Sequence, residues 1–321
     1  MSRPEICSSI VETIGDTPLI ELSRVTGDLD GRILMKLEYF LPGASKKDRV
    51  ARQIIEEAKS SGELKPGQTV VELTSGNTGT GLAIVCRALG HPFVAVMSMG
   101  NSIERRVMIA AFGAEIILVD QAPGGVPGKV TGADLELVKE VTDRVVRDRR
   151  AYHASQFKLP GNFNAHYAHT APEILRQTAG QFDAFIDFVG TGGSFGGCAK
   201  AFKEFNPAIQ CYVAEPAESA VLAGNAIMNP AHKIQGGGYQ WTDLIALDRA
   251  QIDGYVKVTD DEAIDAARRL AREEGVFAGF SSGANLAAAL QLLGSACRGK
   301  TIVVLACDSG MKYLSTDLWN M

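Results

Sequence analysis

Residues 185–194 read Phe-Ile-Asp-Phe-Val-Gly-Thr-Gly-Gly-Ser in a chain of 321 residues, and they indicate the class of structure more clearly than any other stretch. A largely apolar run over 185–189 ends in the glycine-rich turn 190–194, and a helical pattern over 195–205 follows directly. Such a run is typical of a buried parallel strand that is covered by helices. The turn presents backbone N–H groups at the positive end of the helix, where an anion can bind. A tight turn without a ligand is the alternative interpretation.

Strands and helices alternate along most of the chain. Apolar runs rich in Val and Ile predict strands at 33–38, 69–73, 93–97, 115–119, 185–189, 211–214 and 301–306. Helical patterns lie between them, for example at 48–60, 78–88, 102–112, 133–147 and 195–205. The Gly/Pro-rich segment 122–132 predicts a loop on one domain, and the charged segment 147–152 predicts a domain boundary. This pattern predicts the α/β class, with two α/β domains whose sheets are largely parallel.

Two further glycine-rich turns have the same setting as 190–194. Residues 74–79 read Thr-Ser-Gly-Asn-Thr-Gly, and residues 279–283 read Gly-Phe-Ser-Ser-Gly. The first follows the predicted strand 69–73, the second follows a predicted strand-like approach over 276–279, and each precedes a helical pattern. Ligands of open α/β sheets bind beyond the carboxyl ends of the strands, so the three turns could converge on one cleft.

The side chains of the turns differ in the group that they suit. Thr191 and Ser194 add hydroxyl donors to the glycines of their turn, which suits a phosphate. Ser75 or Asn77 could simply cap the next helix, but hydroxyls, an amide and N–H groups together also suit a carboxylate. Ser281 could likewise be a plain helix cap, or it could donate a hydrogen bond to an unprotonated ring nitrogen.

Two adjacent lysines, Lys46 and Lys47, precede Asp48 at the start of the first predicted helix. Lysines at a helix start are usually solvated, which is the plain interpretation for one of the pair, whereas a lysine in a site can react with a carbonyl group. A lysine, a phosphate cradle, a carboxylate site and a donor to a ring nitrogen together predict pyridoxal 5'-phosphate (PLP) as the cofactor.

Composition argues against several other classes of function. The net charge of −5, without a basic block, disfavours nucleic acid and anionic membranes as partners. No apolar run reaches the roughly 18 residues that a membrane-spanning helix needs, and the N-terminal residues do not resemble a signal peptide. The six cysteines form neither a CxxC pair nor a zinc-ligand pattern. We therefore expect no metal and a reducing, cytoplasmic location.

Several motifs resemble those of the fold-type II PLP enzymes, and within them the cysteine synthase and cystathionine β-synthase group. The matching segments are 14–19, 42–49, 74–79, 102–107, 111–115, 156–157, 190–194 and 313–316. The resemblance implies a tryptophan synthase β-like fold with the cofactor in the cleft between two domains. It also implies a smaller mobile domain over 41–152, which carries the substrate-carboxylate loop, and a larger PLP-binding domain over 1–40 and 153–321.

The resemblance implies a role for each residue of the site. It selects Lys47, which directly precedes an Asp-Arg pair, as the catalytic lysine that binds PLP. The implied cofactor-binding residues are Lys47, Asn77 at the cofactor O3', Gly190, Thr191, Gly192, Gly193, Ser194, and Ser281 at the pyridine nitrogen. The implied substrate-binding residues are Thr74, Ser75, Gly76, Thr78, Gln156, Gly236 and Tyr239.

The activity implied by the resemblance is PLP-dependent β-replacement on an activated L-serine, of the O-acetylserine or O-phosphoserine type. The reaction would proceed through an α-aminoacrylate and give L-cysteine or a close analogue, so the enzyme would be a transferase of amino-acid and cysteine biosynthesis. The family suggests a homodimer that acts on small-molecule amino-acid substrates.

One segment departs from the sulfhydrylase pattern and leaves the second substrate open. Residues 236–241, Gly-Gly-Gly-Tyr-Gln-Trp, stand where sulfhydrylases usually continue GIGAGFIP, and they are more similar to the GYDF of cystathionine β-synthases. Condensation with homocysteine is therefore an alternative, and cysteine β-elimination with release of sulfide is another. A serine or threonine dehydratase is disfavoured, because its lysine normally precedes Arg-Gly-Ala. A catalytically silent binding protein is disfavoured by the intact Lys47, Asn77 and Ser281.

Overall fold

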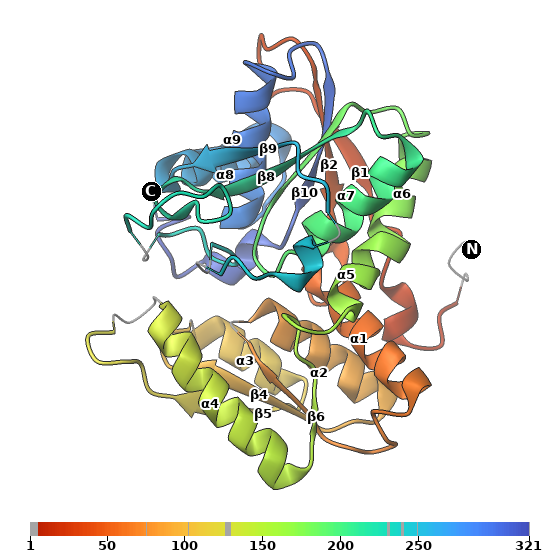
Figure 1. Cartoon of the computed structure of the whole chain (residues 1–321), viewed down its shortest axis with the longest axis vertical. Helices are drawn as coiled ribbons and strands as arrows, with labels where there is room; N and C mark the ends of the chain where they lie inside the picture. The colour runs from red at the N-terminus through yellow and green to blue at the C-terminus, as the bar shows by residue number, and fades with distance from the viewer. Residues whose placement is uncertain are drawn as a thin grey trace. The chain divides into compact units, whose positions relative to one another are not determined.

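The fold is that of a computed structural model, which describes residues 6–74, 76–101, 103–125, 130–229, 232–238, 241–248 and 250–320 (Figure 1). The described residues form two compact units. The first unit contains residues 6–15 and 41–162, and the second contains residues 16–40 and 163–320. Among the described residues, no helix is both long and apolar enough to cross a membrane.

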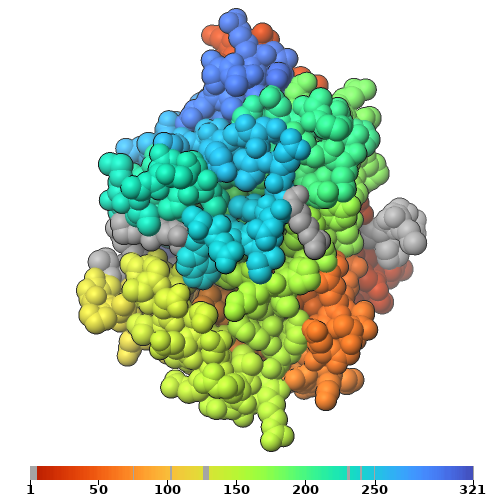
Figure 2. All heavy atoms as spheres, in the orientation of Figure 1, coloured from red at the N-terminus to blue at the C-terminus, as the bar shows by residue number. Residues whose placement is uncertain are grey.

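The first unit is built on a parallel four-stranded sheet in the order β5-β4-β3-β6. Its strands are β3 Val70–Leu73, β4 Phe93–Ser98, β5 Glu115–Val119 and β6 Tyr152–His153. Its helices are η1 Ile10–Thr13, α1 Lys47–Ser61, α2 Asn77–Leu89, α3 Ile103–Ala111 and α4 Gly132–Arg149. Both α2 and α4 pack against β3 and β4, which explains why these two strands are buried along their whole length. The outer side of α4 lies at the surface, in yellow to yellow-green in Figure 2.

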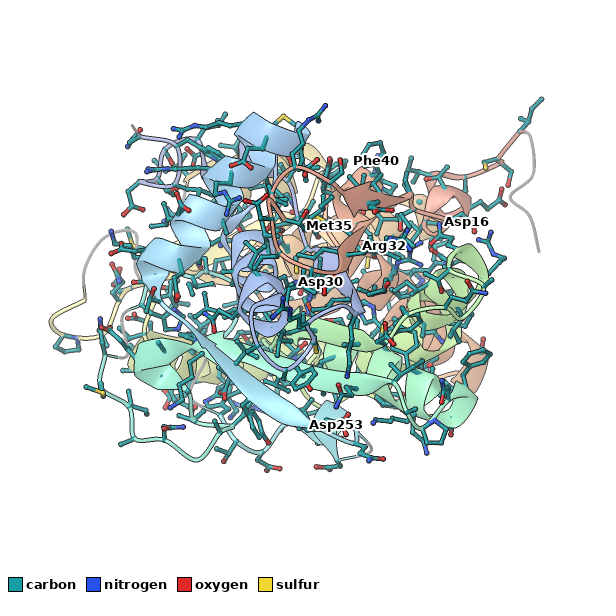
Figure 3. The ribbon with its side chains drawn as sticks, turned by 90° about the horizontal axis from the view of Figure 1, so that it is seen from above. Asp16, Asp30, Arg32, Met35, Phe40 and Asp253 are labelled. Carbon is teal, nitrogen blue, oxygen red and sulfur yellow. The ribbon has the colours of Figure 1, made fainter. Side chains whose placement is uncertain are left out.

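The second unit is built on a six-stranded sheet in the order β1-β2-β10-β7-β8-β9, in which only β1 and β2 pair in antiparallel fashion. The strands are β1 Leu19–Leu22, β2 Arg32–Leu37, β7 Ala184–Phe188, β8 Gln210–Pro216, β9 Gly254–Val258 and β10 Thr301–Ala306. In Figure 3, Arg32 and Met35 mark β2, and Asp253 marks the residue before β9.

The remaining helical segments belong to the second unit, except that α5 begins in the last residues of the first. They are η2 Glu38–Phe40, α5 Gly161–Ala165, the π-helix η3 His166–Thr170, α6 Ala171–Gln177, α7 Gly193–Phe205, η4 Ala217–Ser219, η5 Ile245–Leu247, α8 Asp260–Glu274, α9 Phe280–Leu293 and η6 Gly310–Tyr313. The core of this unit joins the central strands to α8 and α9, with fully buried side chains such as Ile186, Val304, Leu270 and Leu286. Burying each such side chain stabilises the fold by about 1.5–3 kcal/mol.

The predicted strands and helices are confirmed, with ends that differ by one or two residues. Sequence did not single out β1, β6 and β9, because each is a short strand at the edge of its sheet and lacks a long apolar run. The strand-like approach predicted at 276–279 is wrong: only Ala278 forms an isolated bridge, to Ser309. Part of the predicted loop 122–132 lies outside the described residues.

Candidate active site

Lys47 is the first residue of α1, and the main chain around it is tightly packed. The Lys47 N–H donates to the Ser45 hydroxyl at 3.3 Å, and the Gly43 N–H donates to the Asp48 carboxylate at 2.5 Å. A Cβ on Gly81 of α2 would lie 3.0 Å from the Lys47 carbonyl oxygen, so a glycine there lets α2 approach α1 closely. The neighbouring elements therefore hold the backbone of this lysine in one position.

Neither lysine of the pair is a fully solvated surface residue. Lys46 is only 9% exposed, and Lys47 is partly buried. The choice of Lys47 rests on the Asp48-Arg49 pair that follows it, and it stays a prediction.

The turn 74–79 joins the carboxyl end of β3 to the start of α2. The Thr74 hydroxyl accepts the N–H groups of Gly76 at 3.1 Å and of Gly79 at 2.8 Å. Gly76 has a φ of +142°, a conformation that an L side chain rarely adopts, and it is the N-cap of α2. Asn77 is the first residue of α2, so the interpretation of Asn77 as its cap is wrong. Ser75 lies outside the described residues.

Arg105 of α3 packs against this turn and was not identified from sequence. A Cβ on Gly76 would lie 2.5 Å from the Cδ of Arg105, so the arginine stem covers the turn where a larger residue would collide. Arg105 is 7% exposed. Its guanidinium is a positive group near the turn that is predicted to bind a carboxylate.

The structure brings together Thr78 and Gln156, two of the predicted substrate-binding residues. The Thr78 hydroxyl donates to the amide oxygen of Gln156 at 2.6 Å, and both side chains are buried. The Gln156 N–H donates to the Glu72 carboxylate at 3.3 Å, and the Gln156 carbonyl accepts from the Asn162 amide at 2.9 Å. Gln156 is therefore held through its main chain as well as its side chain.

Glu72 is a second residue that sequence did not single out. It is 1% exposed, and its other carboxylate oxygen lies 3.3 Å from the Nε2 of His153. Burial raises the pKa of the Glu72 carboxyl above its usual value, against smaller opposing effects of His153 and Gln156. Its signal in the sequence is a lone acidic residue inside an apolar strand, Val70–Leu73.

In the second unit the structure brings together Gly190 and Gly236. A Cβ on Gly190 would lie 2.3 Å from the carbonyl oxygen of Gly236, and the Gly238 N–H donates to the Val189 carbonyl at 3.2 Å. The turn after β7 is thus packed directly against the segment that departs from the sulfhydrylase pattern. Tyr239 of that segment lies outside the described residues.

The other residues of the 190–194 turn form the start of α7. Gly192 is the N-cap with a left-handed φ of +80°, and Gly193 is the first helical residue. Thr191 and Ser194 are buried. The Ser194 hydroxyl, predicted to face a phosphate, donates to the carboxylate of Asp187.

Asp187 links this turn to α9, the helix that begins near Ser281. Asp187 is fully buried on β7 and accepts a hydrogen bond at 3.1 Å from the amide of Asn285, a residue of α9. The Asn285 oxygen in turn accepts the Phe188 N–H at 2.6 Å. Ser281 is the second residue of α9 and is 7% exposed, and the N-cap is Gly279, so the interpretation of Ser281 as a plain cap is wrong.

The second unit has the donor chemistry that a phosphorylated pyridine needs. The N–H groups in the first turn of α7 have no acceptor within that helix. Gly192 has a left-handed backbone conformation that residues with a side chain rarely adopt. The Ser281 hydroxyl at the start of α9 is of the type that suits a ring nitrogen. The residues present therefore fit PLP.

Comparison with known proteins agrees with this chemistry. Residues 10–308 match the family described as pyridoxal-phosphate dependent enzyme. Cysteine synthase 3 of Caenorhabditis elegans is 39% identical and covers 100% of this chain and 92% of its own length. A cysteine synthase of Staphylococcus aureus is 40% identical and covers 97% of both chains.

Two solved structures extend the comparison. An O-ureido-L-serine synthase is 36% identical with a TM-score of 0.89, over 98% of this chain and 96% of that one. The O-acetylserine dependent cystathionine beta-synthase of Helicobacter pylori is 28% identical with a TM-score of 0.89, over 98% of this chain and 100% of that one. The predicted fold class and cofactor are thereby confirmed. This chain belongs to the pyridoxal-phosphate dependent enzymes of the cysteine synthase family.

Proposed function

We propose that this enzyme replaces the β-substituent of O-acetyl-L-serine by sulfide and so makes L-cysteine, with PLP as its cofactor. The two curated relatives, both named cysteine synthase, support the reaction. The observation that carries the proposal is the 2.6 Å hydrogen bond between Thr78 and Gln156, which joins two segments predicted to bind an amino-acid carboxylate.

We assign the substrate carboxylate to the turn 74–79 and to Gln156. The positive end of α2 favours an anion by about 0.3–1 kcal/mol. The amide oxygen of Gln156 accepts from Thr78, and the amide nitrogen donates one N–H to the Leu73 carbonyl at 3.4 Å. The second N–H of that nitrogen is the donor that would meet a carboxylate. Thr74, Ser75 and Gly76 complete the proposed set.

We assign the cofactor to Lys47, Asn77, the turn 190–194 and Ser281. The first N–H groups of α7 would bind the phosphate, together with the hydroxyl of Thr191. Ser281 would donate to the pyridine nitrogen, and Asn77 would contact the O3' oxygen. Lys47 would hold the cofactor through its Nζ atom.

The same lysine would move the proton that the reaction requires. PLP, when bound, supplies an electron sink that stabilises negative charge at the substrate Cα. Released from the cofactor, the Nζ of Lys47 would take the proton from Cα and later return it there. The carboxylate site would keep Cα in reach of Nζ during both transfers.

The nucleophile is the finer part of the proposal. Sulfide comes first because the cysteine synthases cover nearly the whole chain at higher identity. A nucleophile other than sulfide is the second candidate. The two enzymes of known structure favour it, since one is named an O-ureido-L-serine synthase and the other a cystathionine beta-synthase. Gly236, packed against Gly190, begins the segment that we expect to select between them.

A panel of substrates tests the proposal. The holoenzyme is incubated with O-acetyl-L-serine, O-phospho-L-serine, L-serine or L-cysteine, each with sulfide, homocysteine or hydroxyurea, and the amino-acid products are identified. We expect L-cysteine from O-acetyl-L-serine and sulfide at the highest kcat/KM. If the reaction with homocysteine were faster, homocysteine and not sulfide would be the nucleophile. Release of sulfide from L-cysteine as the only reaction, or no replacement product at all, would overturn the proposal.

We also propose a cytoplasmic homodimer in which residues 41–152 form a mobile domain. The resemblance to the cysteine synthase family supports the dimer and the domain. Burial of Cys86, Cys198, Cys211, Cys297 and Cys307 is compatible with a reducing compartment. Light scattering coupled to gel filtration measures the dimer directly, and a monomer at micromolar concentration would contradict it.

A further inference from the structure

The chain leaves the sheet in an unusual way after β6. The Ala154 N–H donates to the Val71 carbonyl at 3.0 Å, as expected for a parallel ladder between β6 and β3. The next N–H in that register, that of Gln156, would donate to the Leu73 carbonyl. It donates instead to the Glu72 carboxylate at 3.3 Å, and the side-chain nitrogen of Gln156 is the group that reaches the Leu73 carbonyl, at 3.4 Å.

The Glu72 carboxylate therefore takes the place of a ladder acceptor. It is 1% exposed on β3, the strand that leads into the turn 74–79. Its second oxygen lies 3.3 Å from the Nε2 of His153, the last residue of β6. The Glu72 carboxylate thus contacts the His153 side chain at one end of the segment 153–156 and the Gln156 N–H at the other.

This exchange of partners determines where the Gln156 side chain lies. If its N–H continued the ladder, the main chain at 156 would stay in the plane of the sheet. With the N–H on Glu72 and the carbonyl on Asn162, the main chain turns away, and the amide oxygen meets the Thr78 hydroxyl at 2.6 Å. Since the N–H and carbonyl of Gln156 are both bound by side chains, the path of the main chain at 156 depends on these side chains rather than on the β6–β3 ladder.

We propose that Glu72 is a positioning residue for substrate binding, which holds the main chain of Gln156 so that the Gln156 amide faces Thr78 and the substrate carboxylate. The inference rests on the proposed function, in which Thr78 and Gln156 hold that carboxylate. Glu72 acts through Gln156 and has no part in the chemistry.

Kinetics of variants of the holoenzyme, with O-acetyl-L-serine and saturating sulfide, test this role. Glu72→Met removes the acceptor, and Glu72→Asp keeps the charge but withdraws it by one methylene. We expect both to raise KM by about tenfold, the effect of losing one buried hydrogen bond. We expect kcat to stay within about threefold, because the carboxylate is held equally in the ground state and the transition state. Glu72→Gln keeps an oxygen acceptor and should restore KM to within about threefold of the parent value.

A double-mutant cycle separates positioning from general stability. Because Glu72 acts through Gln156, the double variant Glu72→Asp/Gln156→Ala should have the KM of Gln156→Ala alone. The matched control is Glu215→Asp, which shortens another buried carboxylate, one that accepts the N–H groups of Leu222 and Ala223 in the second unit. We expect its KM to be unchanged.

Two results would overturn the inference and can be told apart. If Gln156→Ala raises KM but Glu72→Asp and Glu72→Met do not, or if the two effects multiply, Glu72 does not act through Gln156 and only this inference fails. If Gln156→Ala itself leaves KM unchanged, the proposed carboxylate site fails, and the role of Glu72 fails with it. If Glu72→Met does not fold, Glu72→Asp and Glu72→Gln still give the comparison.

Discussion

The hydroxyl of Thr78 donates to the amide oxygen of Gln156 at 2.6 Å, although 78 residues separate the two in the sequence. Thr78 follows β3, and Gln156 follows β6, and these two strands are neighbours in a parallel sheet. Parallel neighbours end at the same edge, so the residues that follow them meet there. A hydrogen bond at that edge can join two segments of one binding site.

Replacement of Thr78 by valine removes the hydroxyl and keeps a β-branched side chain of similar shape. We expect Thr78→Val to raise the KM for O-acetyl-L-serine by about tenfold, because the Gln156 oxygen loses its buried donor and the amide is free to turn. Thr78→Ser keeps a hydroxyl and serves as the control. Initial rates at saturating sulfide give both values, and an unchanged KM in Thr78→Val would show that the hydroxyl is not needed.

The two adjacent lysines can be distinguished by spectroscopy. We expect Lys47→Ala to lose the visible absorption of the bound cofactor and to lower kcat by about three orders of magnitude or more, as loss of a covalent catalytic group does. Lys46→Ala is the neighbouring control and should keep both. The assignment would be reversed if Lys46→Ala lost the absorption band and Lys47→Ala kept it.

The packing of Gly190 against Gly236 makes Gly190→Ala a test of the phosphate turn. The added Cβ would lie 2.3 Å from the backbone oxygen of Gly236, so the turn must move. We expect a loss of about 1–3 kcal/mol in the free energy of unfolding, together with weaker retention of PLP. Urea denaturation and cofactor titration measure the two effects.

Gly294→Ala is the matched control for that substitution within the second unit. Gly294 has a φ of −72°, and an added Cβ there would meet its nearest atom, the Leu290 carbonyl oxygen, at an ordinary 3.5 Å. We expect Gly294→Ala to unfold like the parent enzyme and to retain PLP. Equal behaviour of the two variants would mean that the turn tolerates a side chain.

The raised pKa of Glu72 predicts how stability changes with pH. Burial raises the pKa of this carboxyl in the folded state above its usual value of 4.5, so the fold favours the neutral form. Its stabilising contribution is complete below pH 4.5 and is lost as the pH rises through the higher folded value. We therefore expect Glu72→Gln to gain stability relative to the parent as the pH is raised from 4.5 to 8 in urea denaturation.

Glu21→Gln should show the opposite sign. The hydrogen bond from Arg32 lowers the pKa of the Glu21 carboxyl below 4.5, so its contribution is present above pH 4.5 and is lost as the pH falls through the folded value. Because Glu21 is half exposed, the change should be small. If the Glu72 variant followed this second pattern, the ionised form of Glu72 would be the one that the fold favours.

The sequence predicted those strands and helices that have a clear apolar run or helical periodicity. The apolar run 301–306 coincides with β10, and the helical pattern 48–60 lies within α1. The edge strands β1 and β9 were not singled out, and the π-helix His166–Thr170 has a local hydrogen-bond pattern that apolar spacing does not reveal. Glu72 and Asp187 are each the single acidic residue of a buried strand. This makes them unusual in the sequence, but it does not show which residues they bind by hydrogen bonds.

The order of residues along the chain was enough to predict an α/β fold and PLP as the cofactor, because turn chemistry and apolar periodicity are properties of neighbouring residues. It was not enough to predict that Gln156 meets Thr78, that Gly190 packs on Gly236 or that Ser194 donates to Asp187. These contacts depend on which strands lie side by side and on how closely the chain packs at their ends. The order of the strands in a sheet results from packing the whole unit, to which every buried side chain contributes. No short stretch of sequence determines that strand order.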